Sequence, residues 1–504
     1  MTMGQARSLS HLGRRCGGVL AMITALGGCA LHPATPLVSH DPDLGDAHYT
    51  RDPLPGLVPA AAGETAQTFS MGGAVEAQWW KAFGSSRLDA FEAEALSANA
   101  DLKAAEAALR LARETFLAQR AAFLPNVQLV GAASRSKNST TIAPPLSSNA
   151  EIYSLDSLGL NVSYLVDVFG VNAKTGEAVA AQLDGQRYLA SAVYLTLTAN
   201  VANAVLQLAS LNTQMDDLHG ARQANQKALE VILHRRALGE ASSNDVALAQ
   251  SGLAQSEQQE AALQKQINAA RDLLAILLGR PPGQAPDVQF RLADFHLPPS
   301  LPVSLPAILV RRRPDVLAAE ANVRAAAAWA GVAAAQRYPN VTLTGSLGGA
   351  SGNLAALLNG SNSLWSFGGA VAQTVFDGGA LAHKQKAAEA ALEQAKAQHR
   401  SAVLGALQST ADVLQAIVDD GAADVHAAEV VEASRRATEI AKNQHDQGQA
   451  GVLVLLAAEA SQAQAQLALD QARAGRFTDT VALYQALGGD WTAPSQPPSQ
   501  RVRP

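Results

Sequence analysis

The most reactive side chains of this 504-residue sequence are two thiols, Cys16 and Cys29, and both lie within the first thirty residues. The rest of the sequence has no cysteine, which excludes a disulfide framework and a Cys-ligated zinc or iron–sulfur site there. Its histidines show no metal-binding spacing, and the sequence contains no HExxH, GxSxG, Walker or CxxC motif. We therefore predict no catalytic residue, no metal site and no enzymatic activity.

The N-terminal residues have the organisation of a secretory signal: arginines, a short apolar run and small residues before Cys29. Leu26-Gly27-Gly28-Cys29 resembles a bacterial lipobox, in which the cysteine becomes the lipid-bearing first residue. We expect a signal peptide over 1–28 and an N-acyl diacylglycerol group on Cys29 as the only attached group. The alternative is an ordinary signal peptide with a chance cysteine. Several acyl chains together form a stable anchor.

Charge and hydropathy restrict which kinds of partner the protein can have. Lys and Arg number 38 against 44 Asp and Glu, a formal charge of −6, which argues against a nucleic-acid partner. After Cys29 we identify no stretch of the roughly 18 to 20 apolar residues that a membrane helix needs. If this protein crosses a bilayer, we expect it to do so with strands.

The sequence contains an internal duplication. Residues 101–107 match 315–321, and Pro125-Asn126-Val127 matches Pro339-Asn340-Val341, both at an offset of 214. Further along, Gly239 matches Gly448 at an offset of 209. The predicted organisation is a signal peptide (1–28), a lipidated extended arm (29–75), a first repeat (76–280), a Pro-rich linker (281–306), a second repeat (307–490) and a disordered tail (491–504).

Each repeat is predicted to read helix, strand, strand, long helix, helix, which makes the fold mainly α with a β part. The first helices are predicted at 86–122 and 314–338, the long helices at 171–238 and 380–447, and the returning helices at 244–278 and 452–487. The strands, predicted at about 126–136, 155–167, 340–349 and 364–375, alternate apolar and polar residues. This alternation is typical of a membrane barrel with a wet interior, although an amphipathic soluble sheet would show it too.

Four strands cannot close a barrel, and open sheet edges are not tolerated in hydrocarbon. Two chains would supply eight strands, a number that side chains fill, whereas three chains would supply twelve and leave room for water. Conduction therefore requires at least three copies.

The sequence resembles the outer-membrane factor (TolC-like) family, in its NodT/OprM-like lipoprotein branch, over about 75–490. The resemblance rests on Trp79-Trp80-Lys81-Ala82-Phe83, on Arg311-Arg312-Arg313-Pro314-Asp315 and on Val375-Phe376-Asp377-Gly378-Gly379. It implies a homotrimer with a twelve-stranded outer-membrane barrel that continues into a twelve-helix periplasmic tunnel. It also implies a passive exit duct for drugs or other small molecules, with a periplasmic adaptor and an inner-membrane pump of the RND or a similar type as partners. The alternatives are protein or peptide export of type I, or a non-conducting periplasmic coiled-coil lipoprotein.

The resemblance also implies two functional regions at the turns between long and returning helices. The adaptor is expected to dock at the two turns, which comprise Leu238, Gly239, Ala241 and Ser242 in the first repeat and Gly448, Ala450 and Gly451 in the second. The alternative for Gly239 and Gly448 is that they simply cap the C-terminal ends of the preceding helices. Asp245 is a gate candidate or, alternatively, a helix-capping residue.

The second repeat departs from the family pattern at the gate, because Val454 and Ala457 stand where aspartates are frequent. Leu453 and Leu456 could form an apolar constriction or, alternatively, a helix-packing seam. Glu459 is a further candidate acid. The substrate is not identified by the sequence.

Overall fold

The computed structural model describes residues 50, 53–73, 75–139, 141, 151–304, 312–357 and 359–489. The predicted signal peptide, Cys29 and the predicted C-terminal tail lie outside the described residues. The chain forms two compact units. One unit, here called the strand unit, comprises Leu111–Asp184 and Ala321–Ala397; the remaining described residues form the helical unit.

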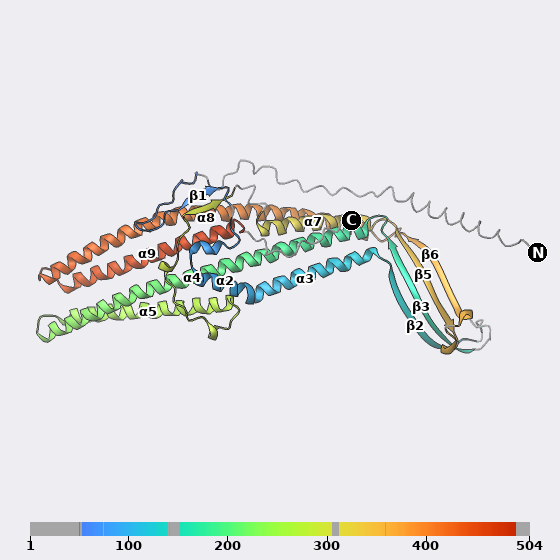
Figure 1. The fold of residues 1–504 in the computed structure, drawn as a ribbon, viewed down its shortest axis with the longest axis horizontal. Helices are drawn as coiled ribbons and strands as arrows, with labels where there is room; N and C mark the ends of the chain where they lie inside the picture. Colours follow the sequence, from blue (N-terminus) through green and yellow to red (C-terminus); the bar gives the residue numbers. More distant parts are fainter. Residues whose placement is uncertain are drawn as a thin grey trace, which may run out of the picture. The chain divides into compact units, whose positions relative to one another are not determined.

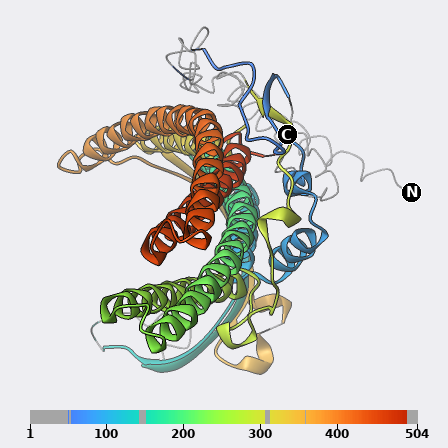
Figure 2. The ribbon, with the colours of Figure 1, turned by 90° about the vertical axis from the view of Figure 1, so that its left-hand side faces the viewer.

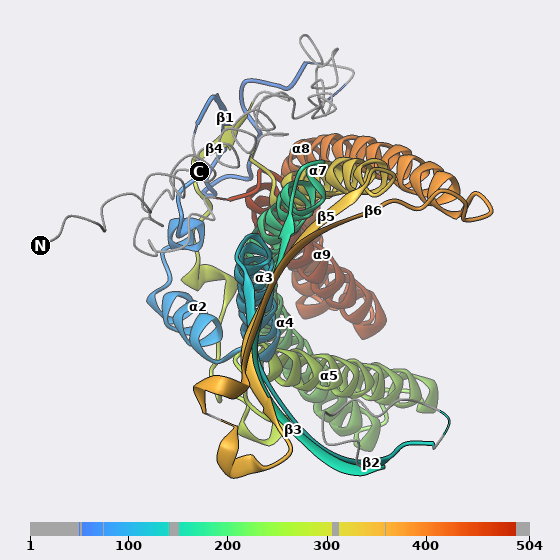
Figure 3. The same cartoon turned by 90° about the vertical axis from the view of Figure 1, so that its right-hand side faces the viewer.

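The strand unit contains a four-stranded antiparallel sheet in the order β2-β3-β5-β6. Figure 3 shows it as one curved ribbon. The strands are β2 (Asn126–Lys137), β3 (Ile152–Val166), β5 (Asn340–Ser351) and β6 (Ser363–Ala372). These bounds lie within three residues of the predicted ones, because period-two alternation and the flanking Pro125 and Pro339 mark strands clearly.

Two pairs of helices dominate the chain. The long helices α4 (Val171–Ala237) and α8 (Ala380–Asp446) have 67 residues each, and the returning helices α5 (Ser243–Leu277) and α9 (Val452–Ala486) have 35 each. Alanine, leucine, glutamine and glutamate, all strong helix formers, fill these segments. Figures 1 and 2 show α5 running back along α4 and α9 running back along α8.

The first predicted helix is divided in two. The sequence predicts one helix over 86–122, whereas α2 (Ser86–Ala98) and α3 (Ala100–Arg120) are separated at Asn99. Asn99 has extended backbone (ψ 134°), and its side-chain oxygen accepts the backbone N–H groups of Asp101 and Leu102. An asparagine cap therefore starts a new helix inside an otherwise helical pattern. The copy in the second repeat is α7 (Pro314–Ala335).

The two repeats use the same junction between the returning helix and the entering helix. In the first repeat the Asn99 side chain donates to the carbonyl of Leu277 (3.0 Å), at the end of α5. In the second repeat Arg313 donates to the carbonyl of Ala486 (3.0 Å), at the end of α9. Asn99 and Arg313 are separated by the offset of 214, and Leu277 and Ala486 by the offset of 209. The duplication thus preserves this contact while changing the donor.

Part of the predicted extended arm packs on the helical unit. Strand β1 (Thr68–Met71) pairs in parallel with β4 (Ser300–Val303) from the predicted linker. Three short 3-10 segments, η2 (Trp79–Phe83), η4 (Pro282–Gln284) and η5 (Leu292–Asp294), complete this region. The arm and the linker therefore have defined structure here, which proline content alone does not reveal.

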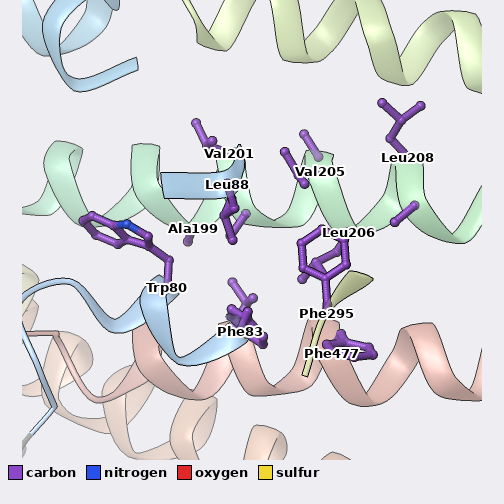
Figure 4. Packing of buried hydrophobic residues seen from close by; sticks show 14 of the residues in the cluster. Trp80, Phe83, Leu88, Ala199, Val201, Val205, Leu206, Leu208, Phe295 and Phe477 are labelled. Atoms are coloured by element: carbon purple, nitrogen blue, oxygen red, sulfur yellow. The ribbon is translucent and has the colours of Figure 1, made fainter. Parts of the chain in front are cut away.

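Aromatic side chains form the centre of the helical unit. Trp79 stacks on Tyr484 of α9 with ring centroids 5.3 Å apart, and Phe83 lies 6.0 Å from Phe477. Figure 4 shows Trp80 and Phe83 on the side of α4 where Ala199 lies. The Trp-Trp-Lys-Ala-Phe motif is thus a packing element that attaches η2 to α4 and α9.

The expectation about apolar helices is wrong. Within the described residues, α4, α8 and α9 each contain an 18-residue stretch long and apolar enough to cross a membrane by length and composition. Alanine explains this result, because it raises the mean hydropathy while remaining small enough for helices to pack closely. On α4 half of that stretch is already buried inside the protein.

Candidate functional site

One face of the sheet is apolar and exposed. The register places Leu129 opposite Leu160, Leu160 opposite Leu347, and Leu347 opposite Trp365, so a row of apolar side chains crosses all four strands. The next row joins Val127, Val162, Gly345 and Phe367 in the same way. Trp365 and Phe367 are 77% and 76% exposed. Such a surface requires an apolar environment.

The opposite face is polar. Asn161 lies opposite Ser346, and Ser346 lies opposite Ser366, to which its hydroxyl is hydrogen-bonded (2.8 Å). A second row joins Ser163 and Thr344. Because neighbouring residues of a strand point to opposite faces, the sheet separates an apolar from a water-compatible side.

Both edges of the sheet are unpaired within the chain. Strand β2 pairs only with β3, and β6 only with β5, among the described residues. Exposed backbone donors and acceptors along these edges have no solvent partner inside hydrocarbon. A sheet with an apolar face and two open edges is therefore incomplete without further strands.

The turn between α4 and α5 ends α4 with a left-handed glycine. Gly239 has φ +80°, and the next residue, Glu240, donates its backbone N–H to Arg235. Leu238 is exposed, whereas Ala241 packs against a small cluster of Ile232 and other apolar residues. This is the usual glycine termination of a helix, as the sequence suggests.

Ser242 and Asp245 form a reciprocal capping box at the start of α5. The Ser242 hydroxyl accepts the backbone N–H of Asp245 (3.1 Å), and the Asp245 carboxylate accepts the backbone N–H of Ser242 (2.8 Å). These hydrogen bonds from Ser242 lower the pKa of Asp245. The capping alternative for Asp245 is therefore realised, and its role in a gate stays a prediction.

The turn between α8 and α9 has the same glycine but no side-chain cap. Gly448 has φ +74°, and Gly451 occupies the position before α9 with no side-chain hydrogen bond. Gly451 and Val454 stand at the offset of 209 from Ser242 and Asp245. The second tip thus lacks both partners of the box. The ring nitrogen of His445 lies 3.2 Å from the carbonyl of Ala450, and backbone hydrogen bonds such as Gln449 N–H to the carbonyl of Gln444 (2.8 Å) also close the turn.

The other gate candidates occupy different environments on α9. Leu456 packs with Val452 against the cluster of Ile232, Val246 and Ala249, which favours the packing alternative for this leucine. Leu453 and Val454 are exposed, as is Ala457. Glu459 is half-buried; burial raises its pKa, and Lys442 opposes the shift.

Several important contacts have no counterpart in the sequence predictions. Arg476 is 2% exposed and donates to Asp424 (2.9 Å), which is fully buried, and to the backbone of Thr65 (2.7 Å). The signal available in the sequence was an arginine among the apolar positions of α9, next to Phe477.

Comparisons with known proteins agree with this architecture. The chain matches the outer membrane efflux protein family over residues 93–280 and 305–489. It is 31% identical to the pyoverdine export outer membrane protein OpmQ of Pseudomonas aeruginosa, over 83% of this chain and 88% of that protein. It is 27% identical to the toluene efflux pump outer membrane protein TtgF of Pseudomonas putida, over 95% and 98%. The crystal structure of VceC from Vibrio cholerae matches with a TM-score of 0.75 and 28% identity, over 82% and 99%.

The chain belongs to the outer membrane efflux protein family, whose members are channel proteins and not enzymes. It has the TolC-like fold and is an outer-membrane efflux channel subunit that extends into the periplasm.

Proposed function

We propose that three copies of this chain close a twelve-stranded pore and form the passive exit duct of a tripartite efflux pump for small molecules. The observation that carries this proposal is the four-stranded sheet, with its apolar face, its polar face and its two unpaired edges. Three copies supply three times four strands, which suffices for a water-filled interior. A tether without conduction would need no such sheet.

The remaining parts of the pump follow from the family. We infer that an inner-membrane transporter, of the RND or a similar type, supplies energy and that a periplasmic adaptor contacts the two helix tips. The tip residues are those predicted from the sequence: Leu238, Gly239, Ala241, Ser242, Gly448, Ala450 and Gly451. An N-acyl diacylglycerol group on Cys29 would add an anchor in outer-membrane lipid.

Small molecules are favoured over proteins as cargo, because relatives across most of the chain carry names of small-molecule export. OpmQ is named for the export of pyoverdine and TtgF for the efflux of toluene. Such chemically different cargoes fit a wide duct that selects weakly, with the pump choosing the substrate.

Planar-bilayer recording with thiol labelling tests the proposal. The described part of the chain has no cysteine, so a single one can be introduced as a probe. Ser346→Cys places it on the polar face, and Leu347→Cys places it on the apolar face one residue away. We expect a charged thiol reagent to reduce the conductance of the Ser346→Cys channel and to leave the Leu347→Cys channel unchanged. Purified protein that never conducts, or equal block of both variants, would contradict the proposal.

A further inference from the structure

Helix α9 carries two aspartates that each face a second aspartate. Asp470 and Asp479 are nine residues apart, which places them about half a turn apart on the helix surface. Asp470 faces Asp217 of α4, and Asp479 faces Asp420 of α8. We call Asp217–Asp470 and Asp420–Asp479 the two carboxyl pairs. They lie on opposite sides of α9, between this helix and each of the long helices.

The carboxyl pairs are shielded from water. Asp470 is 2% exposed, and the amide of Gln466 donates to it over a long distance (3.4 Å). One carboxyl oxygen of Asp470 and one of Asp217 are buried without a hydrogen-bond partner. The members of the other pair are half-buried, and Asp420 lies in contact with the backbone position of Gly475 on α9. Two ionised carboxylates at such a site would repel each other strongly.

The neighbouring arginines are committed to other groups. Arg476 binds Asp424 (2.9 Å) and the backbone of Thr65. Arg473 binds Glu64 (3.0 Å) and lies 3.6 Å from Asp424.

Both arginines act on the carboxyl pairs only at longer range, and the exposed Asp419 beside Asp420 adds a further negative charge. Two guanidinium groups thus serve six carboxyls, those of Glu64, Asp217, Asp420, Asp424, Asp470 and Asp479. The deficit of positive charge has to be met by protons.

The pKa values of Asp470 and Asp479 agree with this excess of carboxyl groups over arginines. Burial, and then Asp217, raise the pKa of Asp470 to about 7. Burial, and then Asp420, raise the pKa of Asp479 to about 7. Each pair therefore holds a shared proton in acidic solution and loses it around neutral pH.

We propose that the two carboxyl pairs form a proton latch on α9: with a shared proton in each pair, α9 is held between α4 and α8, and without it α9 is released. Because the pKa values of Asp470 and Asp479 are raised in the folded protein, the shared protons stabilise the position of α9 fully below the ordinary carboxyl pKa of about 4. It is lost as the pH rises through about 7. Since α9 begins at the uncapped tip, release of the helix reaches the turn with the gate candidates.

Hydrogen exchange of α9 amides in the full-length protein tests the latch. Protection is compared at about pH 5 and about pH 9, roughly two units on either side of the raised pKa values, after correction for the intrinsic exchange rates. We expect α9 protection in the wild-type protein to fall by about tenfold or more, as expected for the loss of one pKa unit of stabilisation. The double variant D470N/D479N, which carries neutral isosteres, should show the same α9 protection at both pH values.

The mirror variant D217N/D420N removes the partners on α4 and α8 and should have the same effect. Asp412→Asn, at an exposed position of α8, is the matched control and should behave as the wild-type protein does. Protection of α9 that does not change with pH in the wild-type protein overturns the proposal. So does a pH dependence that persists in both double variants.

The consequence for transport rests on the proposed channel function and is measured separately. Bilayer recording at the same two pH values should show more frequent opening at alkaline pH in the wild-type protein and no pH dependence in D470N/D479N. Conductance that rises equally in both proteins would refute a role of the latch in opening. Absence of conductance in every protein contradicts the channel itself, and the exchange experiment then decides the latch.

Discussion

The buried ion pair between Arg476 and Asp424 should control how firmly the arm is attached. Both side chains are almost fully buried, and both also bind the arm: Arg476 through the carbonyl of Thr65, and Asp424 through the backbone N–H of Ala61 (3.1 Å). Removing one charge leaves the other buried without a full partner. Replacement of Arg476 by methionine keeps the volume and removes the charge.

The expected cost follows from the burial. Leaving one charge of a buried pair without its partner costs about 3–5 kcal/mol. Arg473, 3.6 Å from Asp424, is already bound to Glu64 and offers only partial compensation. If 3 kcal/mol of this cost is relieved when the arm detaches, the population with a detached arm rises by about a hundredfold, since each 1.4 kcal/mol is a factor of ten.

Limited proteolysis of the folded protein measures this detachment. We expect Arg476→Met to accelerate cleavage within residues 53–73 by about a hundredfold. Arg435→Met removes an ion pair of equal length (2.9 Å to Glu432) that is half exposed, and it should leave the rate unchanged. The double variant R476M/D424L should be less damaging than the two single changes added together. Wild-type cleavage rates in Arg476→Met, or strict additivity, would refute the reasoning.

Two further predictions concern the tips and the repeat junction. Introducing the missing capping box with Gly451→Ser and Val454→Asp should stabilise the first turn of α9 by about 0.5–2 kcal/mol, seen as slower amide exchange there; unchanged exchange would argue against a missing cap. Arg313→Ala should destabilise the end of α9 by about 1–3 kcal/mol, because the carbonyl of Ala486 and the hydroxyl of Ser409 lose their donor. Arg313→Lys should restore only part of the stability, because one ammonium can replace Nη1, which donates to both acceptors, but not the additional bonds of Nε and Nη2 to Asp315; full rescue by lysine, measured by thermal unfolding, would contradict a role for the bonds to Asp315.

The regular part of the fold could be predicted because its signals are periodic. The strands and the long helices of both repeats lie within three residues of the predicted bounds, and the constant offsets revealed the duplication. The break at Asn99 was not predicted, since the apolar pattern continues across it and only the side-chain geometry shows the cap. Likewise α4, α8 and α9 contain apolar stretches that the sequence reading missed, because alanine was not counted as a strongly apolar residue.

The positions of the two turns were predictable, and their side-chain contacts were less so. The turns at Gly239 and Gly448 lie where the sequence places them, with the expected left-handed glycines. The reciprocal bond of Asp245 with Ser242 was one of two alternatives that spacing alone could not separate. The carboxyl pairs join residues more than fifty positions apart, and such pairs leave no local pattern in a single sequence.

The unequal capping of the two tips has a mechanical consequence for any ring built from this chain. Each copy contributes one hairpin whose returning helix starts with a capping box and one whose returning helix starts at a glycine without a side-chain cap. A closed assembly of identical copies therefore alternates stiff and compliant hairpins around its rim. Widening of such a rim begins at the uncapped hairpin of each copy, so every second hairpin moves first. The opening rim therefore keeps the rotational symmetry of the assembly, while its two kinds of hairpin become different in position.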